Sequence, residues 1–143
     1  VRGQMLLFKT DPGLIKRIVL ENNRYVIPRR DGHVLFGSTL EETGFEKSTT
    51  EAARNELYTL ATERFPALQN YPVVRQWAGL RPGSPGGIPY IAAHPSLEGL
   101  YINAGHFRNG VVLGPASAKL IANIVSDTSP VLPLEPYSLE ALR

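Results

Sequence analysis

The 143-residue sequence contains no cysteine and no long apolar run. The lack of cysteine excludes a disulfide scaffold, a thiolate nucleophile and a thiolate metal site. The apolar runs are shorter than the ~18 residues that suggest a membrane-spanning helix, so we predict no membrane span. No secretory leader is recognisable, and a cytoplasmic location is expected. No Gly-x-Gly-x-x-Gly follows an expected strand, so a dinucleotide pyrophosphate site is not predicted within these residues.

Charge of one sign is also scarce, because 15 basic residues are scattered among 13 acidic ones and the formal net charge is +2. The single adjacent basic pair, Arg29-Arg30, precedes a turn. This pattern disfavours nucleic-acid binding. The three histidines, His33, His94 and His106, lack the spacing of metal ligands, so we expect them to have surface or packing roles and predict no metal site.

Short apolar or β-rich stretches separated by turn residues dominate the first 37 residues. Together with later stretches they predict strands at residues 4–10, 18–20, 25–28, 34–37, 73–80, 90–93 and 100–104. The pair Asp31-Gly32 lies between two of these stretches. Because both residues tolerate a positive φ, the pair predicts a β-hairpin with a type I′ turn. The early strands are therefore expected to form an antiparallel meander.

A helix is predicted over residues 49–64. Ser48 and Glu51 have the spacing of a capping box, in which the two side chains satisfy free amide groups at a helix start. Pro66 is expected to end the helix. The predicted buried face, at helical spacing, comprises Ala53, Leu57, Leu60, Ala61 and Arg64. We therefore expect this helix to cover one face of the sheet.

A second helix is predicted to start at Pro115, because the fixed φ and missing amide proton of proline suit a first helical turn. Its expected end lies at residues 127–130. Its predicted buried stripe is formed by Leu120, Ile121, Ile124 and Val125.

Arg81 is a candidate carboxylate-binding residue. It follows an expected strand and precedes a loop rich in glycine and proline, and its guanidinium can donate two parallel hydrogen bonds to a carboxylate. A surface ion pair with Glu98 is the alternative interpretation. Tyr25, at the head of a hairpin strand, could present its hydroxyl to the same carboxylate, and a half-buried aromatic at a sheet edge is the alternative.

Arg108 lies in a loop bounded by Gly105 and Gly110, just before the second helix. Glycine lets the backbone approach a ligand closely, and the start of a helix carries partial positive charge. These features predict a site for an anion or a polar ring edge. The alternative is a strand-to-helix connection whose glycines allow tight packing, because Gly-x4-Gly-x3-Gly is not a defined nucleotide signature.

Two segments carry a family resemblance: Trp77-Ala78-Gly79-Leu80-Arg81-Pro82 and Gly105-His106-Phe107-Arg108-Asn109-Gly110. They closely resemble the C-terminal half of the FAD-dependent D-amino-acid oxidase family, and within it the glycine oxidases most of all. The resemblance extends over nearly the whole chain, to the tail at residues 136–140. Two departures affect substrate preference, because Phe107 replaces a common tyrosine and Leu40 a common methionine.

The resemblance implies functional residues in two groups. The substrate-binding residues it implies are Tyr25, Leu40, Arg81 and Arg108, with Arg81 binding the carboxylate and Leu40 forming part of the pocket wall. The implied flavin-contacting residues are His106, Phe107, Arg108, Asn109, Gly110, Val111 and Val112. No residue is assigned as a catalytic acid or base.

The expected fold class is α+β. Residues 1–93 are expected to form the antiparallel sheet of a substrate-binding domain with its covering helix. Residues 94–143 are expected to supply the strand, flavin-contacting loop and helix that complete an FAD-binding domain. Because the chain opens at Val1 without methionine and lacks the dinucleotide motif, we expect it to be the C-terminal part of a longer polypeptide that binds FAD weakly or not at all by itself.

The resemblance also implies an activity for the intact protein. It would oxidise glycine or a small amine such as sarcosine by hydride transfer to flavin, with imine hydrolysis and hydrogen peroxide formation, and thiamine biosynthesis is the implied pathway. A dehydrogenase that passes electrons to a carrier and a non-catalytic carboxylate-binding or dimerisation module are the alternatives. Exposed apolar surface over residues 100–125 is expected to favour a homo-oligomer.

Overall fold

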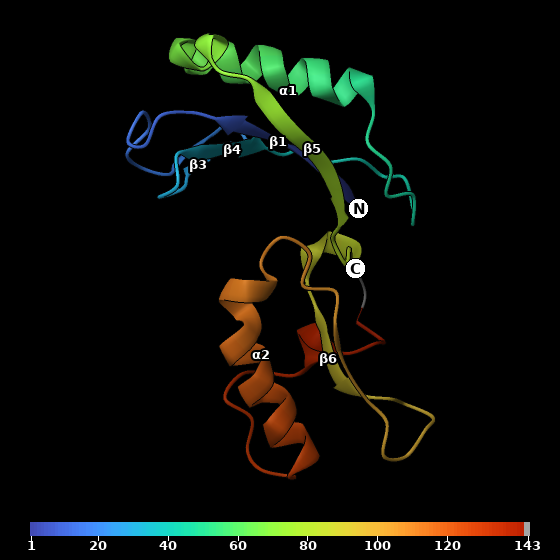
Figure 1. The fold of residues 1–143 in the computed structure, drawn as a ribbon. Helices are drawn as coiled ribbons and strands as arrows, with labels where there is room; N and C mark the ends of the chain where they lie inside the picture. Colours follow the sequence, from blue (N-terminus) through green and yellow to red (C-terminus); the bar gives the residue numbers. More distant parts are fainter. Residues whose placement is uncertain (142–143) are drawn as a thin grey trace. The chain divides into compact units, whose positions relative to one another are not determined.

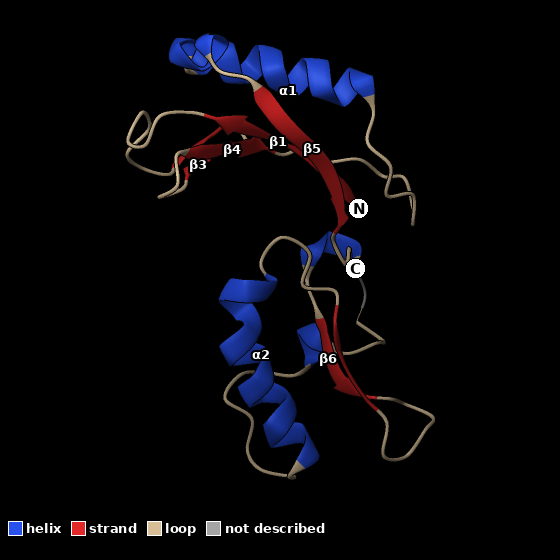
Figure 2. Ribbon diagram, viewed as in Figure 1, coloured by secondary structure: helices blue, strands red, loops and turns tan. Residues whose placement is uncertain are grey.

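A computed structural model describes residues 1–141 of the chain. Its residue contacts divide it into two compact units, the first comprising residues 1–80 and the second beginning at Arg81. Each unit has its own antiparallel sheet and its own α-helix (Figure 1). Figure 2 distinguishes the helices from the strands. The fold class is α+β, as the sequence predicted.

The first unit is built on a five-stranded antiparallel sheet. Its strands are β1 (Arg2–Lys9), β2 (Val19–Glu21), β3 (Arg24–Pro28), β4 (His33–Gly37) and β5 (Val73–Leu80). Their order in the sheet is β2-β3-β4-β1-β5, and every neighbouring pair is antiparallel. The antiparallel meander predicted from the alternating apolar stretches is therefore confirmed, with strand ends that differ from the predicted ones by up to two residues.

The β3–β4 hairpin forms where it was predicted, but its turn is not the predicted type I′. Gly32 has a positive φ of 85°, whereas Asp31 does not. The Asp31 carboxylate accepts a hydrogen bond from the His33 amide at 3.0 Å, and the Arg29 amide donates to the His33 carbonyl at 2.7 Å. Because the aspartate side chain bonds the backbone two residues further on, a longer loop replaces the two-residue turn.

Helix α1 (Glu51–Arg64) covers one face of this sheet (Figure 1). On the helix, Ala53, Leu57 and Ala61 are buried as predicted, whereas Leu60 is only half-buried. The Tyr58 ring stacks on Phe8 at a centroid distance of 6.1 Å. The buried core of the unit comprises Leu6, Phe8, Val26, Val34, Phe36, Leu57, Ala61 and Leu68. Each fully buried leucine or phenylalanine stabilises the fold by about 1.5–3 kcal/mol.

The start of α1 differs from the predicted capping box. Thr50 is the N-cap residue, and its side-chain oxygen accepts from the Ala53 amide at 3.3 Å. The Ser48 hydroxyl instead accepts a hydrogen bond from the Arg2 guanidinium at 3.3 Å. A threonine two residues further on therefore replaces the predicted serine, because a long-range contact with β1 engages Ser48.

The two faces of the first unit's sheet differ in what covers them. Successive side chains of a strand point to opposite faces, and Arg2, Gln4, Leu6 and Phe8 all point to the side of α1, where they are buried. The opposite face carries the row that runs through Met5. We call this opposite side the distal face. Met5, Leu7, Tyr25 and Ile27 on this face are half-buried, whereas Leu35 is buried, so the distal face is partly accessible.

The second unit combines a hairpin with a helix. Strands β6 (Tyr90–Ala93) and β7 (Tyr101–Ala104) pair in antiparallel register, and helix α2 (Gly110–Val125) packs beside them. Short 3₁₀ helices occur at Pro85–Gly87 and Glu135–Tyr137. The compact units divide at Arg81, so β6 belongs with β7 rather than with the residues before it. The expected functional domains, 1–93 and 94–143, concern the intact protein and stay a prediction.

Helix α2 begins five residues before the predicted start at Pro115. The Leu113 amide already donates to the Asn109 carbonyl at 2.8 Å, so a helical turn is complete before the proline is reached. Proline inside a helix removes one hydrogen bond to the carbonyl four residues earlier. That carbonyl belongs to Val111, which is exposed and can be hydrated. An early proline therefore does not prevent the helix from starting at Gly110.

The buried stripe of α2 also differs from the prediction. Leu120 is buried as expected, but Val125 is exposed, and the two isoleucines of the predicted stripe are half-buried. The buried residues besides Leu120 are Ser117 and Asn123. The helix therefore packs through a row spaced by three residues that includes polar side chains. An apolar periodicity could not identify this row.

Candidate functional site

The loop at residues 105–109 is fastened to the segment that follows β5. The Phe107 amide donates to the Pro82 carbonyl at 3.0 Å, and the Ser84 hydroxyl donates to the Gly105 carbonyl at 2.7 Å. Gly105 has a φ of 81°, and a Cβ there would lie 3.0 Å from the Ser84 Cβ. Both the backbone conformation and the close approach therefore favour glycine at this position. Two segments more than 20 residues apart in sequence are thus held together.

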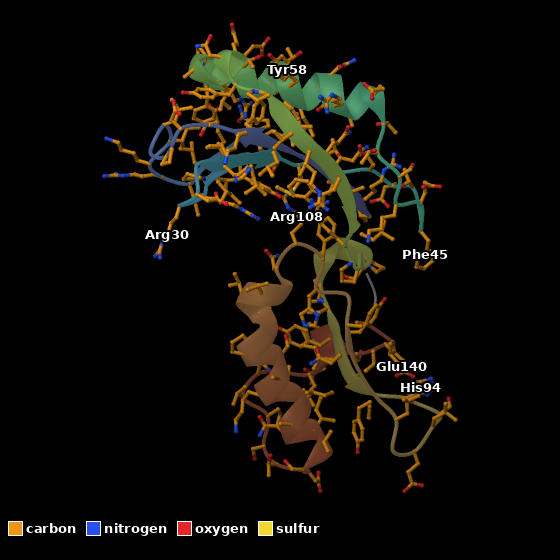
Figure 3. All side chains as sticks on the ribbon, viewed as in Figure 1. Arg30, Phe45, Tyr58, His94, Arg108 and Glu140 are labelled. Carbon is orange, nitrogen blue, oxygen red and sulfur yellow. The ribbon has the colours of Figure 1, made fainter. Side chains whose placement is uncertain are left out.

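The two predicted arginines are sequence neighbours of the two residues that form the Phe107–Pro82 hydrogen bond. Arg81 precedes Pro82, the acceptor residue, and Arg108 follows Phe107, the donor residue. Arg81 is half-buried and Arg108 is exposed, and Figure 3 labels Arg108 in the loop before α2. The backbone next to Arg81 is thus hydrogen-bonded to the backbone next to Arg108. Two basic residues that flank one backbone junction favour binding of an anion nearby.

The start of α2 contributes to the same region. Asn109 is the N-cap residue but makes no side-chain capping hydrogen bond within the described chain, and the first turn is exposed, with Val111 at 94% and Val112 at 82% exposure. Free amide groups and the partial positive charge of a helix start favour an acceptor or an anion. Two exposed valines beside them suit the apolar face of a ring.

His106 fastens the loop to the body of α2. Its Nε2 lies 2.8 Å from the Ser117 hydroxyl oxygen, and Ser117 is buried. Gly110 also lies close to this histidine, because a Cβ at Gly110 would be 3.5 Å from the His106 Cβ. His106 therefore has a packing role, one of the two roles that its lack of metal-ligand spacing predicted. The hydrogen bond also limits how the loop can move relative to the helix.

In the first unit, Tyr25 lies in a cross-strand row on the distal face. Gly37 of β4 pairs with Tyr25 on one side and with Met5 on the other. The half-buried Tyr25 hydroxyl lies 3.6 Å from the Met5 sulfur. A Cβ on Gly37 would lie 2.8 Å from the Met5 Cγ, so the missing side chain makes room for Met5 to reach the tyrosine.

Met5 and its neighbour Trp77 were not identified from the sequence as candidate site residues. Met5 pairs with Trp77 of β5, and the Arg75 guanidinium lies 5.7 Å from the centre of the Trp77 ring. The period-two alternation of β1 could have indicated that Met5 and the core residue Leu6 face opposite sides. The pairing of β1 with β5, which spans about 70 residues of sequence, could not be foreseen from local patterns.

Leu40, the other predicted pocket residue, lies just after β4 and is 55% exposed. Its neighbours on both sides are held by hydrogen bonds. Thr39 accepts a hydrogen bond from the Gln4 amide at 2.8 Å, and the backbone of Glu41 forms a bridge with Arg2. The exposed leucine therefore projects from a segment whose backbone is fastened to β1.

A polar cluster surrounds Glu41. The Arg2 guanidinium donates to the Glu41 carboxylate at 2.5 Å, and the Gln4 side-chain amide donates to the same carboxylate at 3.0 Å. The Thr39 hydroxyl donates to it as well. Burial by itself would raise the pKa of Glu41, but the hydrogen bonds from Thr39, Arg2 and Gln4 and the charge of Arg2 hold that pKa below its ordinary value. Glu41 is therefore an ionised carboxylate with several donors.

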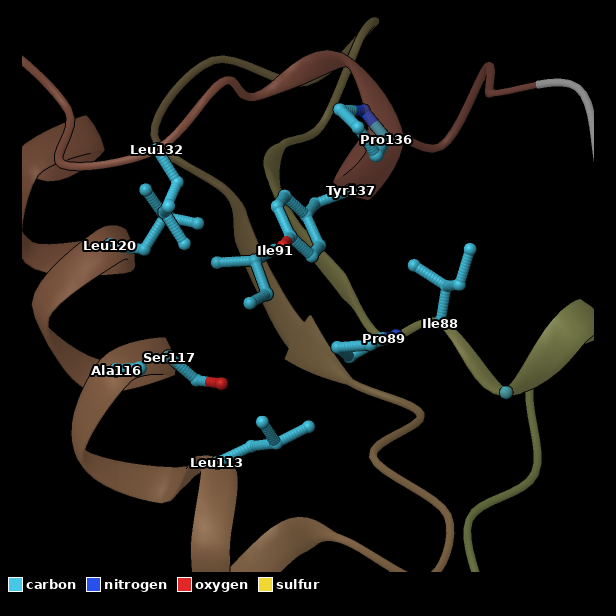
Figure 4. A pocket seen from close by; sticks show the side chains of 11 residues that line it. Ile88, Pro89, Ile91, Leu113, Ala116, Ser117, Leu120, Leu132, Pro136 and Tyr137 are labelled. Atoms are coloured by element: carbon cyan, nitrogen blue, oxygen red, sulfur yellow. The ribbon is translucent and has the colours of Figure 1, made fainter.

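The second unit also contains an apolar pocket of about 290 Å³ (Figure 4). It is lined by Gly87, Ile88, Pro89, Ile91, Leu113, Ala116, Ser117, Leu120, Leu132, Pro136 and Tyr137. No charged side chain lines it, so it suits an apolar group rather than a carboxylate. Local sequence patterns do not indicate this pocket, because its walls come from four separate segments.

Within residues 1–141, no three histidine, aspartate or glutamate side chains are grouped so that they could hold a metal ion. In the same residues, no helix is both long enough and apolar enough to cross a membrane.

Comparison with known proteins places these features in a family. Residues 1–124 match the family described as FAD dependent oxidoreductase. The chain belongs to this family. It is 50% identical over 138 residues to glycine oxidase of Pseudomonas aeruginosa, an alignment that covers 96% of this chain and 38% of that protein.

Two solved structures of other proteins share this fold. The crystal structure of glycine oxidase from Geobacillus kaustophilus matches with a TM-score of 0.90 and 28% identity, over 99% of this chain and 39% of that one. L-proline dehydrogenase from P. horikoshii matches with a TM-score of 0.85 and 25% identity, over 96% of this chain and 38% of that one. The chain thus spans about two fifths of the length of these relatives.

The residues around the start of α2 fit a flavin. Flavin rings combine carbonyl and nitrogen acceptors at one edge with flat apolar faces. The first turn of α2 offers amide donors, Arg108 offers a charged donor, and the exposed Val111 and Val112 offer apolar contact. The fastened backbone at Gly105 keeps these groups in fixed positions relative to one another.

Proposed function

We propose that the intact protein is an FAD-dependent amino-acid oxidase that acts on glycine or a similarly small amine and yields hydrogen peroxide. The observation that carries this proposal is the hydrogen bond from the Phe107 amide to the Pro82 carbonyl, which joins the backbone beside Arg108 to the backbone beside Arg81. A carboxylate anchor beside a flavin-binding loop is what such an oxidation requires. The similarity to glycine oxidase over 96% of the chain supports the substrate class.

In this proposal, Arg81 anchors the substrate carboxylate through two parallel hydrogen bonds. Tyr25 donates a further hydrogen bond, and Leu40 forms part of the pocket wall. A carboxylate bound by both Arg81 and Tyr25 leaves the substrate α-carbon with few orientations. Such positioning accounts for much of the rate acceleration in reactions without covalent catalysis. We assign no catalytic acid or base, because an amine that enters neutral needs no protein group to remove its proton.

The residues His106, Phe107, Arg108, Asn109, Gly110, Val111 and Val112 are proposed to contact the flavin. With flavin bound, Arg108 and the amide groups of the first turn of α2 would supply positive charge that stabilises the negative charge of the reduced ring. When bound, FAD supplies the acceptor for a hydride from the substrate α-carbon, and oxygen then takes up the electrons as hydrogen peroxide.

We extend the proposal to domain roles and pathway. Residues 1–93 would contribute the substrate-binding sheet and residues 94–143 the end of the FAD-binding domain. A small-amine oxidase of this kind would fit thiamine biosynthesis, the pathway implied by the resemblance to glycine oxidases.

The test is peroxide formation by the full-length protein with FAD, using glycine and sarcosine as substrates. We expect Arg81→Ala to lower kcat/KM by about 100-fold, because a charged, bidentate anchor is lost. Arg81→Lys should fall between the wild type and the alanine variant, since lysine offers a point charge without the planar pair of donors.

Arg30→Ala is the matched control, because Arg30 is an exposed arginine in the β3–β4 loop (Figure 3). Its kcat/KM should stay within about twofold of the wild type, as for most surface substitutions. Equal effects at Arg81 and Arg30 would argue against carboxylate anchoring by Arg81. A flavin-loaded wild type that forms no peroxide from any amino acid would overturn the oxidase proposal itself.

A dehydrogenase is the second candidate, favoured by the match to L-proline dehydrogenase with a TM-score of 0.85. Both activities use the same hydride transfer and differ in what reoxidises the flavin. Substrate-dependent reduction of an artificial electron acceptor, with little oxygen consumption, would favour the dehydrogenase over the oxidase.

A further inference from the structure

We propose that Glu41, paired with Arg2, is a positioning residue that holds Leu40 in place as a fixed wall of the substrate pocket. The inference rests on the proposed function for the role of the pocket, and on the polar cluster for its mechanism. Neither Glu41 nor Arg2 was among the residues singled out from the sequence. Both lie on the side of the sheet that faces α1, so neither is expected to touch the substrate itself.

Several hydrogen bonds attach the segment around Leu40 to β1. The Glu41 carboxylate accepts hydrogen bonds from Arg2, Gln4 and Thr39. The backbones of Arg2 and Glu41 exchange two further hydrogen bonds, at 2.8 and 3.0 Å. Arg2 is only 6% exposed and Gln4 is fully buried. Water therefore competes little for these hydrogen bonds, and they hold the segment more firmly than exposed ones would.

The neighbours of Leu40 indicate where its side chain points. Thr39 and Glu41 both direct their oxygen atoms into the cluster, on the side of α1. Successive side chains of an extended segment point to opposite sides. Leu40 therefore points away from the cluster, and its 55% exposure agrees with this direction. A shift of either neighbour would displace the leucine directly.

On the side of Gln4, the polar cluster reaches the start of α1 and β5. The Gln4 side chain accepts a hydrogen bond from the Thr50 amide at 2.9 Å, and its amide nitrogen lies 3.1 Å from the Thr50 hydroxyl. The Gln76 side chain donates to the same Gln4 oxygen at 3.0 Å. One buried glutamine thus connects β5, the start of α1 and the carboxylate beside Leu40. The segment that carries Leu40 is thus connected to β5 and to the start of α1, and not only to its own loop.

The Arg2–Glu41 ion pair joins a buried arginine to a half-buried glutamate, whose side chain is 25% exposed. An ion pair partly removed from water is seldom more stabilising than well-packed apolar residues, but removing one partner leaves an uncompensated charge. Such a pair allows one arrangement of its segment and penalises the others. We infer that Arg2 and Glu41 specify the position of the Leu40 segment. The expected consequence is a pocket wall that is placed before the substrate arrives.

The experiment uses the full-length protein with FAD and compares Glu41→Gln with Glu42→Gln. Both substitutions remove one carboxylate from the same loop, but Glu42 is exposed and makes no contact in the cluster described above. We expect Glu41→Gln to raise KM for glycine by about fivefold with kcat nearly unchanged, a change typical of one member of a polar network. Glu42→Gln should leave both constants unchanged.

A second readout follows the backbone directly. Hydrogen exchange at the amides of residues 39–41 should become faster in Glu41→Gln than in Glu42→Gln, because the backbone bridge to Arg2 opens more often. If Glu41→Gln does not fold, Thr39→Val removes a single hydroxyl of the cluster and serves as the milder variant. It should raise KM and exchange rates in the same direction.

A double-mutant cycle with Leu40→Ala tests whether Glu41 acts through the leucine. In the Leu40→Ala background, Glu41→Gln should cause little further increase in KM. Additive effects, or a loss of kcat with unchanged KM, would overturn the positioning role. A wild-type protein without amine oxidation would overturn the proposed function instead, while the exchange measurement would still show whether Glu41 fixes the segment.

Discussion

At the scale of single residues, glycines make room for the candidate functional residues next to them. Gly37 has no side chain, yet the space it leaves allows Met5 to approach the Tyr25 hydroxyl. Gly105 similarly permits the contact with Ser84 that fastens the loop before α2. In both places a glycine determines where a neighbouring functional group can lie. The proposed roles of Tyr25 and Arg108 therefore depend on these spaces.

Gly37→Ala tests the close approach in β4. The added Cβ would lie 2.8 Å from the Met5 Cγ, so Met5 has to move, and we expect a loss of about 1–3 kcal/mol in the free energy of unfolding. Gly79→Ala in β5 is the control, because a Cβ there meets nothing within 4 Å. Urea unfolding of the full-length protein measures both. Equal losses at the two positions would contradict the close contact.

At the scale of elements, the start of each helix is set by contacts that lie outside the helix. Helix α1 begins after Thr50, whose side chain serves as the cap and also contacts Gln4 of β1. Helix α2 begins at Gly110, next to a loop held by His106 and Pro82. The N-termini are therefore fixed relative to the sheet and loop that surround them. This matters because residues at both termini belong to the proposed site or support it.

Thr50→Ala tests the cap of α1. We expect it to lower the free energy of unfolding by about 1 kcal/mol, the usual effect of removing an N-cap oxygen. Thr50→Ser keeps that oxygen and should retain most of the stability. Thermal unfolding monitored by circular dichroism compares the two variants. Alanine and serine variants of equal stability would show that the side-chain oxygen does not cap the helix.

At the scale of the whole molecule, acid should weaken the first unit through Glu41. Its pKa is lower in the folded protein than the ordinary value of 4.5, although burial by itself acts in the opposite direction. A lowered folded pKa means that the stabilisation is complete above pH ~4.5 and is lost as the pH falls through the folded pKa. The pKa of Glu46 is also lowered, chiefly by hydrogen bonds from the backbone and side chain of Ser48 and to a smaller extent by the charge of Arg2.

We therefore expect the free energy of unfolding of the wild type to fall more steeply below pH ~4.5 than that of Glu41→Gln, since glutamine does not titrate. Urea unfolding at several pH values between neutral and acid measures this difference. Parallel curves for the two proteins would mean that Glu41 does not contribute the acid dependence.

Self-association is the second prediction at this scale. Val111, Val112 and Val125 of α2 are 94%, 82% and 55% exposed. Exposed apolar surface of this kind favours association, so we expect a preparation of residues 1–143 to have a mass that rises with concentration in sedimentation experiments. A monomer mass that does not depend on concentration would contradict the prediction.

Much of the fold could be predicted from local patterns, and the misses have physical causes. The strands at 73–80 and 90–93 were placed correctly, because apolar stretches bounded by glycine and proline specify strands locally. The predicted start of α2 was wrong, because the preference of proline for a first helical turn is local and does not reflect the tertiary contacts that hold residues 105–110. In the proposed site, Arg81 and Arg108 were singled out from their own segments. Met5 and Glu41 were not, because their importance depends on partners more than 30 residues away.

The sequence by itself determined the fold class, most of the strands, the first helix and the two arginines, because periodicity, turn residues and guanidinium chemistry are local properties. Only the tertiary structure decided which oxygen caps α1, where α2 begins and which side chains surround Leu40. Those outcomes depend on contacts between distant segments, such as Arg2 with Ser48 and Phe107 with Pro82. A local sequence pattern does not specify such contacts. Many pairings of the same strands and loops are compatible with one pattern, and packing of the core selects among them.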